Sequence, residues 1–167
     1  MFDSPDGADS ILPLGRSFGN SLRHVNKLIQ RDLGSRIAPL GITLAQWYAL
    51  RTLWISDGLT QIELAQKSGA AGPAMVIAVR SLLAMGLVVR KRDASDQRKY
   101  IISLTEKGRR FEEPALQAAI DANAAATVNV DPQDLEICMR VLRQAHQTLL
   151  VNAGSGDPNV DIDAIVA

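Results

Sequence analysis

Apolar residues recur at helical spacing in two long segments, one near each end of the chain. The first runs from Leu14 to Ile37 in steps of three and four residues, and Pro39 ends it. The second begins at Asp131-Pro132, a pair typical of a helix start. Its apolar side consists of Leu135, Cys138, Leu142, Ala145 and Leu149. The spacing predicts an amphipathic helix at each end.

Three shorter helices are predicted between these segments. Thr43 with Gln46, and Thr60 with Glu63, have the spacing of capping boxes, in which two side chains satisfy free amide groups at a helix start. Pro73 suits the first turn of the third helix, where its missing N–H costs nothing. The middle of the chain is therefore a cluster of short helices.

A charged β-hairpin follows this cluster between Leu87 and Gly108. Two β-branched runs flank a short polar loop, and both arms carry basic residues. Short helices followed by such a hairpin are typical of a winged helix-turn-helix, which places one helix in the DNA major groove while the hairpin reaches the backbone and minor groove.

The predicted fold class is mainly α with a small β-hairpin wing. We expect one domain at 13–152, between a flexible tail at 1–12 and an acidic tail at 153–167. Within it we expect a helix at 13–38, a winged helix-turn-helix at about 43–105, a linking helix at about 105–128 and a helix at 131–152.

The two terminal helices have apolar stripes outside the compact middle segment. Packing them between two copies of the chain would bury both stripes and give a two-fold homodimer, the symmetry of a pseudo-palindromic operator. The alternative is that they pack on their own subunit.

Charge is segregated although the net charge is zero. Residues 80–110 contain nine basic residues and three acidic ones, whereas the ends of the chain are acidic. A basic excess favours binding of double-stranded DNA through its phosphates, although a run of charge is more often only a solvated surface.

Composition narrows the function further. No apolar run is long enough to span a membrane or resembles a signal peptide, so we expect a cytoplasmic protein with no membrane partner. A single cysteine excludes an internal disulfide framework, and we expect no metal and no cofactor. We also expect no enzyme activity, because His24, His146 and Cys138 lack partner motifs, and Cys138 is predicted to be a buried, unreactive thiol.

Several motifs then identify a family resemblance over residues 14–150. The most specific are Asp96-Gln97-Arg98 followed by Leu104-Thr105-Glu106-Lys107-Gly108, and they are accompanied by Leu44-Ala45-Gln46-Trp47-Tyr48-Ala49-Leu50, Leu59-Thr60-Gln61-Ile62-Glu63-Leu64-Ala65 and Gly86-Leu87-Val88. The sequence resembles the MarR family of winged-helix transcription regulators, and within it the SlyA-like branch.

The resemblance implies an obligate homodimer in which a wing arginine enters the minor groove. By position, Arg98 is that arginine and Asp96 braces the wing, although Asp96 would also suit a plain turn. The neighbouring wing residues expected to contact DNA are Ser95, Gln97 and Lys99. Thr60 and Gln61 are also expected to contact DNA, from the start of the short helix that Thr60 caps.

The recognition helix departs from the family pattern of Ser, Thr, Arg or Gln on the exposed face. Matching by position buries Met75, Val79 and Leu82. The residues expected to face the groove are Gly72, Pro73, Ala74, Ile77, Ala78 and Ser81. Apolar groups contact thymine methyls but do not read guanine, so discrimination should rely on the wing and on DNA shape. The alternative is a dimer with weakened or lost operator reading that acts as a ligand-binding or interaction module.

The family often binds small aromatic or phenolic acids. His24, Trp47 and Arg51 are the set expected to hold such an effector, although Trp47 also suits the core and Arg51 the surface. The sequence thus predicts a dimeric, sequence-specific DNA-binding regulator, a repressor released by a small aromatic acid.

Overall fold

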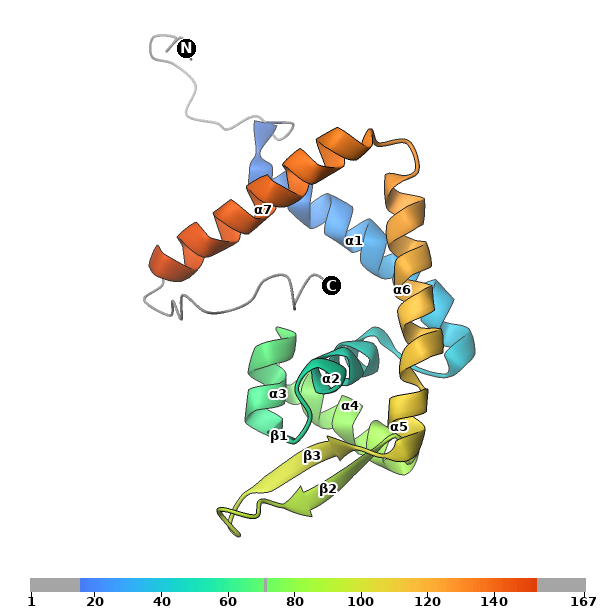
Figure 1. Ribbon diagram of the computed structural model, residues 1–167, viewed down its shortest axis with the longest axis vertical. Helices are drawn as coiled ribbons and strands as arrows, with labels where there is room; N and C mark the ends of the chain where they lie inside the picture. Colours follow the sequence, from blue (N-terminus) through green and yellow to red (C-terminus); the bar gives the residue numbers. More distant parts are fainter. Residues whose placement is uncertain (1–15, 71, 153–167) are drawn as a thin grey trace.

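The computed structural model describes residues 16–70 and 72–152, so the predicted tails at 1–12 and 153–167 and Leu14 lie outside the described residues. The α-helices are α1 (Phe18–Ile37), α2 (Leu44–Ile55), α3 (Gln61–Ser68), α4 (Gly72–Ala84), α5 (Glu106–Arg110), α6 (Glu112–Thr127) and α7 (Pro132–Asn152), with a short 3-10 helix, η2, at Ala38–Leu40 (Figure 1). Both predicted capping boxes are confirmed. The prediction of a single linking helix at about 105–128 is not confirmed, because the chain forms two helices there, α5 and α6, with Phe111 between them.

The sheet has three antiparallel strands in the order β1-β3-β2, where the sequence predicts two. The hairpin is β2 (Val88–Arg92) and β3 (Tyr100–Leu104), and β1 (Leu59–Thr60) pairs with the outer edge of β3. A two-residue strand is too short to show the alternation of polar and apolar residues from which strands are predicted.

The core lies among α2, α3, α4 and the base of the hairpin. Its largest fully buried side chains in this region are Leu50, Leu53, Leu64, Met75, Leu82 and Leu87. The alanine-rich helix α6 packs against α1 and α2, and Ala115 and Ala122 are buried there because a methyl group allows close approach. None of the described helices is long and apolar enough to cross a bilayer.

The terminal helices extend away from this core (Figure 1). In α1 only Leu33 and Ile37, at its C-terminal end, are buried, and in α7 no residue is buried. The exposed large apolar side chains include Phe18, Leu22, Val25 and Leu28 on α1 and Ile137, Val141, Leu149 and Val151 on α7. Packing on their own subunit therefore leaves both apolar faces uncovered.

Candidate nucleic-acid interface

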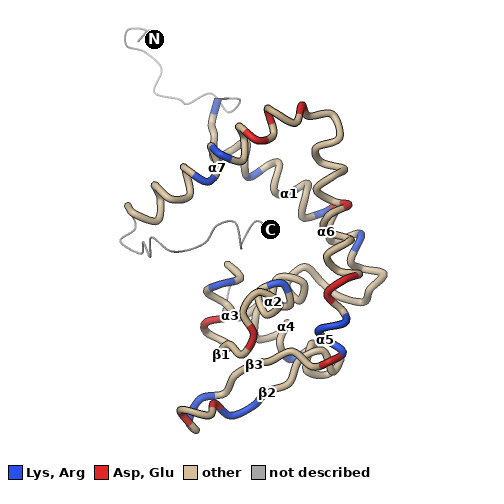
Figure 2. Tube along the Cα trace, viewed as in Figure 1, with Lys and Arg blue, Asp and Glu red and all other residues tan. Residues whose placement is uncertain are grey.

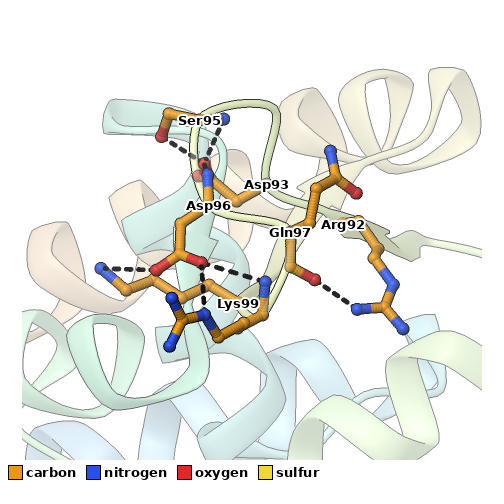
Figure 3. A network of polar contacts seen from close by, with 7 residues as sticks. Arg92, Asp93, Ser95, Asp96, Gln97 and Lys99 are labelled. Atoms are coloured by element: carbon orange, nitrogen blue, oxygen red, sulfur yellow. Dashed lines mark hydrogen bonds and ion pairs between the residues drawn. The ribbon is translucent and has the colours of Figure 1, made fainter.

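Two aspartates fix the wing loop between β2 and β3 (Figure 3). Asp93 Oδ1 accepts hydrogen bonds from the Ser95 hydroxyl and from the backbone amides of Ser95 at 2.7 Å and Asp96 at 2.8 Å. The Ser95 hydroxyl, followed by these amides, lowers the pKa of Asp93. The Asp-x-Ser spacing of an Asx turn is the signal by which this brace could have been found in the sequence.

Asp96 braces the other half of the loop. Its Oδ1 accepts the Arg98 amide at 3.0 Å, and its carboxylate lies 4.0 Å from Arg98 Nε and 3.9 Å from Lys99 Nζ. The Arg98 side chain is nevertheless 97% exposed. The loop backbone is held while the guanidinium projects into solvent, and Ser95 and Gln97 are exposed beside it. Figure 2 shows basic residues gathered along β2 and this loop.

The two residues expected at the start of α3 lie at its N-terminus. Thr60 accepts the Glu63 amide, and Glu63 Oε2 accepts both the Thr60 amide at 2.8 Å and its hydroxyl at 2.7 Å. These bonds with Thr60 lower the pKa of Glu63. The Thr60 side chain is therefore engaged in capping α3, and Gln61 beside it is half-buried.

The structure corrects the predicted outward face of α4 at two positions. Ala78 is only 3% exposed, and Ser81 is half-buried and turned inward, because both lie on the side of α4 that packs against α2. Gly72, Pro73, Ala74 and Ile77 are exposed as expected.

Two residues that sequence reasoning missed complete this exposed face. Val76 and Arg80 are exposed on α4 next to Ile77, and the spacing of three and four residues among 73, 76, 77 and 80 is the periodicity that could have identified them. Arg80 brings a guanidinium, which can donate two hydrogen bonds to guanine, to a face on which sequence matching predicted Ser81 as the only polar side chain.

A buried glutamine fixes the orientation of α4. Gln46 is a buried polar residue in α2, and its Oε1 accepts the Thr43 amide at 2.7 Å. Its Nε2 donates to Ser81 Oγ at 2.6 Å and lies 3.7 Å from Met85 Sδ. The capping box of α2 is thereby joined to the inward face of the recognition helix, which explains the inward position of Ser81.

The three residues expected to bind an effector have different environments. Trp47 belongs to the core, and its indole N–H donates to the Ala115 carbonyl at 3.4 Å. Arg51 is half-buried one turn along α2, and His24 is exposed on α1 beside Arg23. A hollow of about 360 Å³ lies elsewhere, beside α5, and is lined by Lys107, Arg110, Phe111 and Pro114.

Cys138 also differs from its prediction. It is exposed rather than buried, because it lies on α7, none of whose residues is buried within the chain. Among the described residues, no group of three or more His, Cys, Asp or Glu side chains is placed to hold a metal ion.

The sequence and the fold are both similar to those of known transcription regulators. The sequence profile described as "MarR family" matches residues 40–99, which include α2, α3, α4 and most of the wing. The HTH-type transcriptional repressor Rv2887 of Mycobacterium tuberculosis is 31% identical over 117 residues, which cover 69% of this chain and 84% of that protein. The chain belongs to the MarR family.

Solved structures of similar proteins share the fold. A probable transcriptional regulator from Pseudomonas aeruginosa is 27% identical, has a TM-score of 0.71, and aligns over 80% of this chain and 99% of its own. Rv2887 in complex with p-aminosalicylic acid is 26% identical with a TM-score of 0.67, over 78% of this chain and 98% of its own. The wing and recognition helix of this MarR family chain thus stand in a fold shared with known regulators.

Proposed function

We propose that this chain is a homodimeric, sequence-specific DNA-binding transcription regulator of the SlyA-like branch, acting as a repressor in the cytoplasm. The observation that carries the proposal is the braced wing, which follows α4 in the chain and holds Arg98 with its side chain 97% exposed. A guanidinium suits the negative potential of a narrow minor groove, and a braced loop lowers the entropy lost on binding. The SlyA-like assignment rests on Asp96-Gln97-Arg98 and Leu104-Thr105-Glu106-Lys107-Gly108.

The homodimer rests on the uncovered apolar faces of α1 and α7. An uncovered apolar helix face marks an interaction site, and the helices at the two ends of the described chain each have such a face. We assign dimerisation to residues 18–37 and 132–152, and DNA binding to the segment from α2 to β3. A two-fold dimer presents two copies of α4 to a pseudo-palindromic site.

The proposed effector is a small aromatic acid. Rv2887 structures hold p-aminosalicylic acid and salicylic acid, which supports this ligand class for a relative of similar fold. Arg51 is the cation that we assign to the effector carboxylate, with Trp47 as part of the wall and His24 at the margin. An effector releases DNA only if it binds the two conformations of the dimer with different affinity.

Fluorescence anisotropy with a labelled duplex from upstream of the chain's own gene tests the DNA-binding proposal. We expect binding at least 10³-fold tighter than to a scrambled duplex of equal length, the usual margin for specific sites, and weaker binding on addition of salicylate. Equal affinity for the two duplexes would contradict operator reading and favour the interaction-module alternative, which the apolar residues Val76 and Ile77 on α4 would then serve.

A further inference from the structure

We propose that Arg90 and Arg92, stacked on Tyr100, form a second contact with the DNA sugar-phosphate backbone, along the arms of the wing rather than at its tip. The inference rests on the proposed DNA-binding function and assigns Tyr100 as a positioning residue. The guanidinium carbon of Arg90 lies 4.0 Å from the centroid of the Tyr100 ring, and that of Arg92 lies 4.8 Å from it.

The hairpin register brings the three side chains together. Arg92 pairs with Tyr100 across the strands, and Arg90, two residues earlier on β2, pairs with Ile102 on the same face. A neighbouring tyrosine on the opposite strand is therefore shared by two arginines. No local motif in the sequence indicates this cluster, because the stacking depends on register.

The same face of the hairpin packs on the helices at its base. Val88, Ile102 and Leu104 alternate with the outward residues and are buried in the core, so Arg90, Arg92 and Tyr100 continue that face beyond the edge of the core. Lys91 lies on the opposite face of β2. The stacked arginines thus lie on the side of the wing that joins the helix-turn-helix.

Stacking on Tyr100 holds both arginine side chains in a position from which they can bind a phosphate. A guanidinium over a ring keeps its edge N–H groups free to donate, and a long side chain already held in place loses less freedom on binding. In the described part of the chain neither guanidinium is paired with a carboxylate, although Arg92 also donates to the Gln97 carbonyl in the wing loop. Arg90 is therefore the cleaner position for a substitution.

The test uses the full-length protein and a random-sequence 30-base-pair duplex, because a backbone contact does not depend on sequence. Binding is measured by anisotropy over a range of salt for the wild type and for Tyr100→Leu, Tyr100→Phe, Arg90→Ala and Lys91→Ala. Thermal unfolding checks that each variant is folded. The Arg Nε–H signals in NMR spectra of the free protein report stacking directly, since the ring shifts them.

We expect Tyr100→Leu to weaken binding roughly 5- to 30-fold for each subunit in contact with the duplex, the effect of two exposed cation–π interactions, and to remove the ring-induced shifts of the Nε–H signals. Tyr100→Phe should retain both. Arg90→Ala should lower the salt slope by about one unit per subunit and weaken binding more than Lys91→Ala.

Wild-type affinity in a folded Tyr100→Leu, or equal effects of Arg90→Ala and Lys91→Ala, would overturn the inference while leaving DNA binding intact. A wild type that binds neither this duplex nor promoter DNA would overturn both the proposed function and this contact.

Discussion

Arg109 on α5 donates a hydrogen bond to Asp57, in the turn after α2, with 2.6 Å between Nη2 and Oδ2. The other oxygen of Asp57 accepts the amides of Gly58 and Leu104, each at 2.9 Å. One carboxylate thus joins the helix-turn-helix, the end of β3 and the helix that leads to α6. The pairing ties the DNA-binding segment to the arm that carries the dimerisation helices.

Asp57→Ala should lower the free energy of unfolding by about 1–3 kcal/mol, because the part-buried Leu104 amide loses its acceptor. Arg109→Ala should cost less than about 1 kcal/mol, since its side chain is half exposed and its ion pair is screened. Urea denaturation of both variants and of the double variant measures the coupling. A larger loss for Arg109→Ala than for Asp57→Ala would contradict this ranking.

Leu22→Asp and Leu149→Asp should each convert the dimer to monomer or aggregate, because the interface would then hold an unpaired buried charge. Lys27→Asp is the matched control, since it adds an acid to α1 away from the apolar stripe. Sedimentation velocity at micromolar concentration gives the result. A wild type that sediments as a stable monomer would contradict the assignment of α1 and α7.

Arg98→Ala should cost about 1–3 kcal/mol of operator affinity and lower the salt slope by roughly one unit per subunit, because each subunit then brings one cation fewer to the minor groove. Ile77→Ala should cost less and relax the preference at one base position, because Ile77 offers only a methyl contact. Binding of both variants to one operator over a range of salt compares them. Wild-type binding by Arg98→Ala, with binding abolished in a folded Ile77→Ala, would reverse the roles of wing and helix.

Arg51→Ala should weaken binding of salicylate while leaving DNA affinity without effector nearly unchanged, because only differential contacts shift the two-state balance. Arg110→Ala is the control, because Arg110 lines the hollow beside α5 and is another cation that could bind the salicylate carboxylate. Calorimetry with salicylate and anisotropy with DNA separate the two effects. Loss of salicylate binding in Arg110→Ala alone would move the effector site to that hollow.

The wing turn should respond to acid through Asp93. Hydrogen bonds from Ser95 and from the backbone lower its pKa below the ordinary value of 3.8, so the ionised carboxylate stabilises the turn above that pH. This contribution is lost as the pH falls through the lowered pKa. The Ser95 amide signal in NMR spectra should therefore stay constant from pH 8 to about pH 4.5 and move at lower pH. Movement centred near neutral pH would show that another group controls the turn.

The elements whose signals are local could be predicted from the sequence. Thr43 with Gln46 and Thr60 with Glu63 mark helix starts within four residues, and the structure confirms both. The side of α4 that faces solvent was harder to predict. The burial of Ala78 and the inward position of Ser81 depend on packing against α2, and Gln46 of α2, which binds Ser81, lies 35 residues away in the sequence. Arg90 and Tyr100 likewise meet only through the hairpin register. Cys138 is exposed because no part of the described chain covers the apolar face of α7.

Sedimentation equilibrium of the protein with a duplex from its own promoter shows whether two copies of the chain bind one DNA site together. We expect a complex of two chains per duplex that survives an excess of scrambled DNA. A complex with one chain per duplex, or one displaced equally well by promoter and scrambled competitors, would contradict it.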